Sequence, residues 1–246
     1  SGPSLFHGNY DINVNGGGTF VVDVPSSSAN AWNSDWYVTN ATFLANDDLK
    51  MARFGLGSGA VFGGLGEITG RSGRDANFNN GSTLAPGGDG VFGDTVGTLS
   101  WNSNFGSGHD INLNNGSTYA VDFTSTDADL LRLVNSSSAS QLNIGNTVTL
   151  SLTGVCGPAT TYTIVEKDAP EAPNIVGRFD EYLLNGESVD PLTDPRFDIA
   201  YSNSAVSVTF HTAIPEPGSA SLVAVLAAYG LVARRPRFCT RGKSPS

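Results

Sequence analysis

Aromatic side chains gather at one point of the 246-residue sequence and offer the first candidate site. Trp32, Trp36 and Tyr37 lie close together in the chain. Exposed aromatic rings can stack on the flat faces of sugar rings, whereas buried rings fill a core. We therefore interpret these three residues as a candidate carbohydrate-binding site, and a buried aromatic cluster is the alternative.

Carboxylates form two short clusters, at residues 47–48 and 127–129. Paired carboxylates can hydrolyse glycosides, but their separation decides that chemistry and the sequence does not give it. We expect solvated loop residues at both places. The segment GGDGVFGD at residues 87–94 partly matches a calcium-binding repeat, yet it occurs once and carries Phe92 where a carboxylate is expected. A turn is the interpretation that we adopt there.

The histidines do not predict a site. His7, His109 and His211 lack the close spacing of metal ligands. His109 and Asp110 follow Ser107, but no constrained nucleophile turn accompanies them. We therefore predict no catalytic residue, no metal and no cofactor, and we expect a protein that is not an enzyme.

The charge balance excludes one class of partner. The chain has 13 basic and 23 acidic residues, a formal charge of −10. Five of the basic residues follow position 233, so the preceding part carries 8 against all 23 acidic residues, or −15. Proteins that bind nucleic acids neutralise phosphates with Lys and Arg, so we expect no nucleic-acid partner.

The elements that must position any site are β-strands. Apolar and polar residues alternate with a period of two, as expected of strands with one buried face, at residues 20–24, 118–123, 147–153 and 206–210. Tight turns are indicated by the pairs Asn15-Gly16, Asn80-Gly81, Asn115-Gly116 and Asn185-Gly186. Residues 44–54 (LANDDLKMARF) are the one place in this part where we expect a helical turn or two.

A short repeat indicates how the strands are arranged. NNGST at residues 79–83 recurs at residues 114–118, and residues 145–149 are a looser copy. The interval corresponds to one or two turns of a coil of strands, which predicts a β-solenoid. A β-sandwich or jelly roll, whose hairpins share the same turn residues, is an equally good interpretation of the periodicity alone.

Three short motifs resemble a known repeat family. They are GLGEI at residues 64–68, GSTLAPG at 81–87 and GTL at 97–99. In this order they are similar to the autotransporter-associated β-strand repeat, and the likeness extends loosely over residues 55–213. The resemblance implies a right-handed parallel β-helix. Residues 166–174, which are acidic and contain proline, depart from the pattern and are interpreted as an inserted loop.

The C-terminal segment has a different composition. Residues 218–233 are 16 uncharged residues, which span about 24 Å as a helix. This is close to the length that a membrane span needs. Arg234, Arg235 and Arg237 follow immediately and favour the cytoplasmic side of a membrane. We therefore predict one short transmembrane helix that is flanked by basic residues.

A further motif precedes this helix. Pro215, Glu216 and Pro217, followed by the apolar run and the arginines, resemble the PEP-CTERM sorting signal of bacteria. The resemblance implies processing by an exosortase, a membrane protease-transferase, and export to the cell surface or an extracellular polymer matrix. The nine residues after position 237 exceed the usual short basic end of this signal.

Together these observations divide the chain into three parts. We expect a β-solenoid surface domain at residues 1–213, the sorting signal at 214–237 and a disordered tail at 238–246. Because Ser1 is not a Met, we also expect that further residues precede it. The predicted function is that of an exported structural or adhesion protein with polysaccharide as a candidate partner. The alternative is a secreted carbohydrate-active β-helix enzyme or a carbohydrate-binding protein.

Overall fold

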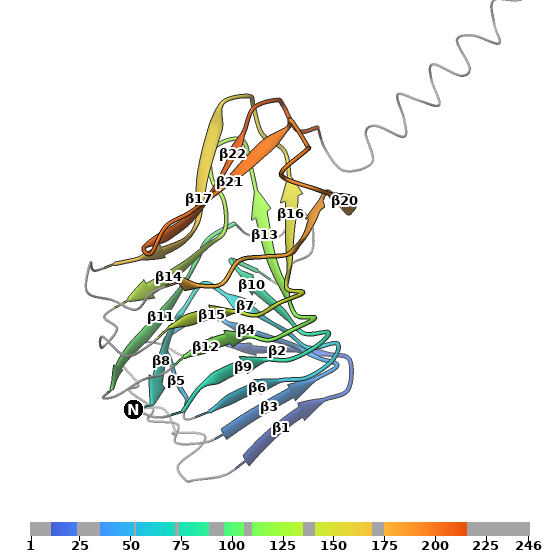
Figure 1. The fold of residues 1–246 in the computed structure, drawn as a ribbon. Coiled ribbons are helices and arrows are strands. Elements are labelled where there is room, and N and C mark those ends of the chain that lie inside the picture. Colours follow the sequence, from blue (N-terminus) through green and yellow to red (C-terminus); the bar gives the residue numbers. More distant parts are fainter. Residues whose placement is uncertain are drawn as a thin grey trace, which may run out of the picture.

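The computed structural model describes residues 11–23, 35–51, 53–71, 74–88, 96–105, 110–134, 141–168 and 175–215. Strands are the only regular secondary structure in these ranges, and they form three sheets that wrap around a common interior (Figure 1).

Strands that follow one another in the chain mostly belong to different sheets, so each sheet contains about every third strand. Sheet A contains β1 (Asp11–Asn15), β3 (Asp35–Thr39), β6 (Phe54–Leu56), β9 (Ala76–Phe78), β12 (Ile111–Leu113), β15 (Leu142–Ile144) and β18 (Ile175–Val176). Sheet B contains β2 (Thr19–Val22), β4 (Thr42–Ala45), β7 (Val61–Gly64), β10 (Thr83–Pro86), β13 (Thr118–Phe123), β16 (Thr149–Gly154), β19 (Glu181–Leu184) and β20 (Glu187–Val189). Sheet C contains β5 (Leu49–Met51), β8 (Glu67–Arg71), β11 (Thr98–Phe105), β14 (Leu130–Val134), β17 (Thr160–Lys167), β22 (Ala205–Phe210) and β21 (Phe197–Tyr201).

Parallel pairing makes the chain a coil. From β3 to β19 the chain visits sheets A, B and C in order, and each of the strands β3 to β16 pairs in parallel with its counterpart one turn later. This is the stacked-rung arrangement of a solenoid. The all-β, solenoid-like prediction is therefore confirmed at this level. A sandwich or jelly roll does not fit, because among the described strands antiparallel pairing occurs only in β17–β22, β22–β21 and β19–β20.

Stacked turns form the corner between sheets A and B. Gly81, Gly116 and Thr147 have positive φ values of 75°, 77° and 58°. The Gly81 amide donates to the Gly116 carbonyl oxygen (2.8 Å), and the Gly116 amide donates to the Thr147 carbonyl oxygen (3.0 Å). Thr83 pairs with Thr118, so the repeated NNGST motif marks one turn of the coil and not two. Asn185-Gly186, in contrast, closes the antiparallel β19–β20 hairpin.

Every second residue of a strand points inward, and these residues fill the interior of the coil. Phe43 on β4 stacks on Phe62 on β7 (ring centroids 5.6 Å apart) and meets Trp36 edge to face (5.2 Å). All three rings are fully buried. Burial of each large apolar side chain contributes about 1.5–3 kcal/mol. The buried side chains form one continuous core along the coil.

The expected helix at residues 44–54 is wrong. This segment contains the end of β4, the whole of β5 and the first residue of β6. Leu49 and Met51 are both buried and lie two positions apart, which is the spacing of a strand with one inward face. Parallel pairing of β5 with β8 supplies the backbone partners, so tertiary contacts override the local helical preference.

Antiparallel strands close the described C-terminal end of the coil. β22 pairs antiparallel with β17 and β21 pairs with β22, which extends sheet C past its last parallel strand. Phe210 on β22 is buried against Phe123 on β13, with ring centroids 4.8 Å apart. This group of strands lies at the opposite end of the molecule from β1 (Figure 1).

Candidate functional site

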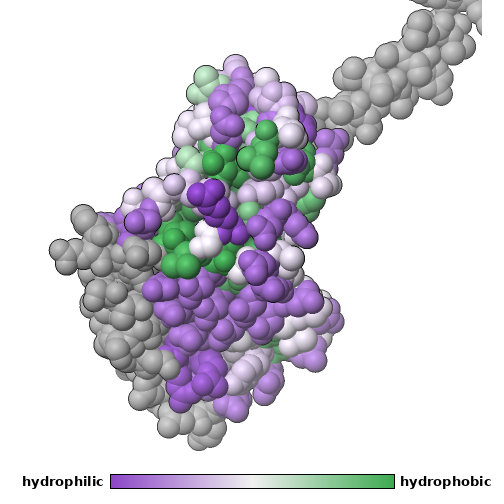
Figure 2. Space-filling model, viewed as in Figure 1, coloured by the Kyte–Doolittle hydropathy of each residue, from purple (hydrophilic) through white to green (hydrophobic). Residues whose placement is uncertain are grey.

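The outer face of sheet A carries a row of asparagines. Asn77, Asn112 and Asn143 occupy matching positions on β9, β12 and β15. Nδ2 of Asn112 donates to Oδ1 of Asn77 (3.0 Å), and Nδ2 of Asn143 donates to Oδ1 of Asn112 (2.8 Å). We call these three residues the asparagine ladder. Figure 2 shows hydrophilic residues over the strands of sheet A that face the viewer.

On the preceding strand of sheet A, β6, the position that matches the asparagine ladder is occupied by Gly55, which has no side chain. Gly55 pairs with Tyr37 on one side and with Asn77 on the other. The next outward position is Gly57, whose amide donates to the Val38 carbonyl oxygen at 2.8 Å. Two missing side chains in succession therefore leave a depression in an otherwise covered face.

This depression is an open groove of about 510 Å³, which we call the sheet A groove. Gly55 and Gly57 form its floor. The other residues that line it include Tyr37, Thr39, Asn77 and Asn79 along the sides and Arg53 and Asp75 at one end. Its volume falls within the range of small-molecule sites in proteins, roughly 300–1,000 Å³.

Charged residues surround the Arg53 end of the groove. Nη1 of Arg53 lies 3.9 Å from Oδ2 of Asp35, and Nη1 of Arg74 lies 3.7 Å from the same oxygen. A hydrogen bond to the Tyr37 side chain, together with the Asp35 carboxylate, raises the pKa of Arg53. Arg53 is therefore a permanent cation that its neighbours hold beside the tyrosine ring.

Stacked aspartates continue this edge of sheet A beyond the groove. The Asp110 amide donates to Oδ1 of Asp75 (3.2 Å), and the Gln141 amide donates to Oδ1 of Asp110 (2.8 Å). Burial raises the pKa of Asp110, and the nearby Asp75 carboxylate acts in the same direction. The hydrogen bond from Gln141 opposes this shift.

The predicted aromatic site is divided by the sheet. Trp36 has no exposed surface and packs in the core, so the interpretation that it is available to a sugar is corrected. Tyr37, the next residue, points outward and lines the sheet A groove. Trp32 lies outside the described residues. Only Tyr37 of the three is thus placed at a candidate site.

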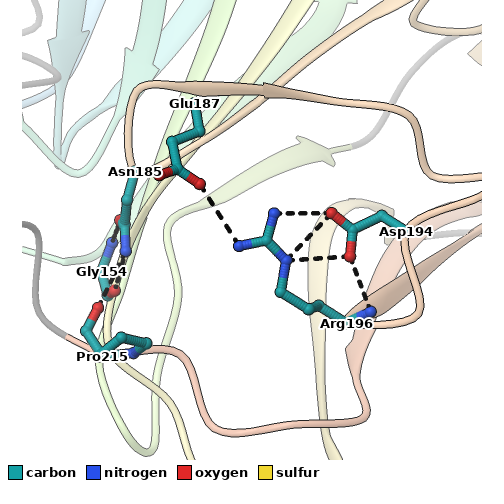
Figure 3. A network of polar contacts seen from close by, with 6 residues as sticks. All are labelled: Gly154, Asn185, Glu187, Asp194, Arg196 and Pro215. Atoms are coloured by element: carbon teal, nitrogen blue, oxygen red, sulfur yellow. Dashed lines mark hydrogen bonds and ion pairs between the residues drawn. The ribbon is translucent and has the colours of Figure 1, made fainter. Parts of the chain in front are cut away.

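The predicted sorting motif begins where the described chain ends, at Pro215. Ile214 and Cys156 form an antiparallel bridge, with N–O distances of 3.0 and 3.2 Å. Nδ2 of Asn185 donates to the carbonyl oxygens of both Pro215 and Gly154, each at 3.1 Å (Figure 3). The start of the motif is therefore fixed to the C-terminal rungs of the coil.

The rest of the C-terminal prediction falls on residues that are not described. These are Glu216, Pro217, the apolar run at residues 218–233, and Arg234, Arg235 and Arg237. Within the described ranges, the structure contains no helix with the length and apolarity that a membrane span requires.

The remaining polar candidates are structural where they are described. Asp129, which we expected to be a solvated loop residue, is buried and accepts hydrogen bonds from the amides of Gly97 (2.9 Å) and Asp122 (2.8 Å). A buried carboxylate needs such donors, which explains its position. Nε2 of His211 lies 2.7 Å from Oδ2 of Asp198 on the surface. His7 and His109 are not among the described residues.

Sequence reasoning missed most of the sheet A groove. Arg53, Gly57 and Asp75 drew no attention because nothing local links them, and Asn79 was noted only as the first residue of the NNGST repeat. One signal was present: Asn-x-Asn occurs at residues 77–79 and again 35 residues later, and the Asn79 and Asn114 side chains hydrogen-bond at 3.0 Å. In a coil, a polar pair that recurs at the length of one turn marks a shared outer face.

Neither a cluster of metal ligands in the described ranges nor a similar known protein identifies the site. In these ranges no group of three or more His, Cys, Asp or Glu side chains is arranged to hold a metal ion. Comparison with known proteins gives no match: no family model, no curated protein and no solved structure is significantly similar to this chain.

Proposed function

We propose that this chain is an exported bacterial cell-surface or extracellular-matrix protein with a structural or adhesive role. The observation that carries the proposal is the asparagine ladder, whose amides are joined strand to strand by hydrogen bonds of 3.0 and 2.8 Å on the outer face of a stacked coil. Amide side chains do not titrate or act as nucleophiles, but they offer both donors and acceptors. Such a face suits contact with another surface better than it suits catalysis.

The finer parts of the proposal concern fold and sorting. The body is a right-handed parallel β-helix, the hand that parallel crossover connections favour. Residues 218–233 form a short transmembrane helix, with Arg234, Arg235 and Arg237 on the cytoplasmic side. An exosortase-type enzyme recognises Pro215, Glu216 and Pro217. Support comes from the composition of the tail and from the attachment of Pro215 at the edge of the coil.

Fractionation of a bacterium that contains an exosortase-type enzyme tests the proposal. When the full chain is produced in this bacterium, it is expected to reach the outer surface, where mass spectrometry should find a C-terminus that lacks residues 218–246. Replacing Pro215, Glu216 and Pro217 together by Ala should leave the C-terminus intact and hold the chain at the membrane. A matched control replaces Ser244, Pro245 and Ser246 by Ala and should be processed normally.

Two results would contradict parts of this proposal. Intact chain that is freely dissolved in the cytosol would overturn export. Surface-exposed chain that retains residues 218–246 would overturn processing.

A further inference from the structure

We infer that the sheet A groove is a binding site for a neutral saccharide, with Tyr37, Arg53, Asp75, Asn77 and Asn79 as its ligand-facing residues. The groove lies open on the outer face of the coil and has a volume of about 510 Å³. This inference deepens the proposed adhesive function and rests on it for its biological meaning, because it names the class of molecule that the surface would hold.

The glycines of the floor are the first argument. Gly55 lies within β6 and Gly57 directly follows it, both at outward-facing positions. Glycine weakens a strand, and in this setting it often marks a place where a ligand approaches the backbone closely. A Cβ at Gly55 would lie 3.2 Å from Cδ1 of Tyr37, and a Cβ at Gly57 would lie 3.1 Å from Oγ1 of Thr39. The Tyr37 and Thr39 side chains thus lie against the two glycines, and a side chain at either glycine would push them out of their present positions in the groove wall.

The chemistry of the lining is the second argument. Asn77 and Asn79 offer amide donors, because their Oδ1 atoms already accept hydrogen bonds from Asn112 and Asn114. Arg53 offers further donors, and Asp75 offers acceptors. A sugar hydroxyl both donates and accepts, so this mixture matches several hydroxyl groups at once. Tyr37 adds an aromatic ring against which the apolar C–H face of a pyranose can pack. A ring-shaped ligand with many hydroxyl groups uses all of these residues together.

Charge decides between neutral and acidic saccharides. Arg53 and Arg74 both lie near Asp35, and Asp75 lines the same end of the groove, so the two cations face two carboxylates. The local formal charge is balanced, and the whole chain carries −10. A polyanionic glycan would be repelled at long range, while a neutral one is not affected.

The asparagine ladder extends the site along the coil. Asn77 belongs both to the groove and to the ladder, and its Oδ1 accepts a hydrogen bond from Asn112. This bond fixes the orientation of the Asn77 amide, so that Nδ2 is the group left to face the groove. A preorganised donor binds a ligand with a smaller loss of side-chain entropy.

The test uses the purified full chain in detergent micelles and soluble tetrasaccharides as probes. Neutral probes are β-1,4-glucan, β-1,4-mannan, α-1,4-glucan and β-1,3-glucan fragments, and a galacturonate tetrasaccharide is the charged counterpart. We expect calorimetric titration to detect at least one neutral probe and to show weaker binding of the galacturonate. Tyr37→Ala and Asn77→Ala should each weaken binding by roughly tenfold or more.

Two further variants make the result specific to the groove. Gly57→Asn places a side chain on the floor and should abolish binding while the thermal unfolding midpoint changes little. Thr161→Ala, which removes an exposed side chain from β17 in sheet C, is the control and should bind like wild type. Failure of every neutral probe to bind, stronger binding of the galacturonate, or full affinity in Tyr37→Ala and Gly57→Asn would overturn the inference.

The outcome is independent of sorting. Binding in solution with loss of export in the fractionation experiment would overturn the proposed function and leave the site standing. Normal export and processing without saccharide binding would overturn only the site.

Discussion

At the scale of single residues, the outer edge of sheet A contains a carboxyl group whose ionisation opposes folding. Burial and the neighbouring Asp75 raise the pKa of Asp110. The folded state therefore binds a proton more tightly than the unfolded state, so this residue favours folding at low pH. That contribution is lost as the pH rises from the ordinary aspartate pKa through the raised one.

Asp110→Asn should therefore stabilise the protein at neutral pH. The Asn side chain retains an oxygen that can accept the hydrogen bond from the Gln141 amide. Since the group is partly exposed and solvent screens it, we expect a gain of only roughly 0.5 kcal/mol in the free energy of unfolding at pH 7. Urea titrations at pH 4 and pH 7 measure this, and Asp180→Asn on an exposed site serves as control. Stability that rises for wild type but not for the variant between these pH values would contradict the argument.

The division of the aromatic cluster also belongs to the residue scale. Trp36 and Tyr37 are neighbours in β3, and successive side chains of a strand point to opposite faces. The two rings could therefore never have formed one platform, and this much could be predicted from the sequence. Which of them faces the core could not, because both are large aromatic residues. Parallel pairing with β6 places Trp36 opposite Phe54 in the interior and Tyr37 opposite Gly55 on the surface.

At the scale of elements, the stacked corner turns fix the register of the coil. Gly116 has a φ of +77°, and a Cβ there would lie 2.5 Å from Oδ1 of Asn80 in the preceding turn. Gly186 has a similar φ of +82°, but a Cβ there would meet nothing within 4 Å. A side chain at Gly186 would therefore meet only backbone strain, whereas a side chain at Gly116 would meet backbone strain and a contact with the preceding turn.

Gly116→Ala should therefore destabilise the protein more than Gly186→Ala does. We expect about 1 kcal/mol for Gly186→Ala, from the left-handed backbone alone, and about 2 kcal/mol for Gly116→Ala. Chemical denaturation of both variants measures the difference. Adding Asn80→Ala to the Gly116 variant should remove most of the excess, because it deletes the oxygen that the new Cβ meets. Equal costs for the two glycines would contradict a contact between the turns.

The sequence predicts the strands well and their partners poorly. Alternation at residues 118–123 and 206–210 correctly predicted β13 and β22, because alternation is a local property. It does not tell that β13 pairs in parallel with β16 whereas β22 pairs antiparallel with β17. The groove depended on those partners, since Tyr37, Gly55 and Asn77 become neighbours only through β3, β6 and β9. Its residues could not be grouped before the register was known.

At the scale of the whole molecule, each turn of the coil contacts mainly the turns beside it. Stability in such an array is approximately a sum of local terms, so damage at one end need not spread to the other. Phe210 is a suitable point for this test, because it is buried in the antiparallel end against Phe123 and Phe197.

Phe210→Ala should lower the free energy of unfolding of the C-terminal strands by about 3–5 kcal/mol. Hydrogen exchange measured by mass spectrometry is expected to show faster exchange in β17, β21 and β22 and unchanged protection in β6, β9 and β12. Leu192→Ala is a matched control, since Leu192 is 92% exposed. Equal loss of protection in all turns would show that the coil unfolds as one cooperative unit.

The bridge between Ile214 and Cys156 determines which way the molecule is presented. A molecule that binds the chain after Pro215 therefore binds it beside β16 and β19, near the C-terminal end of the coil. Gly55 and its surroundings lie toward the other end, because β6 and β18 are separated by four strand spacings, roughly 19 Å. Under the proposed function, the coil is a short stalk that separates the sheet A groove from the point of attachment. Lengthening the stalk by whole turns between β12 and β15 would move the groove outward by about 4.8 Å per turn.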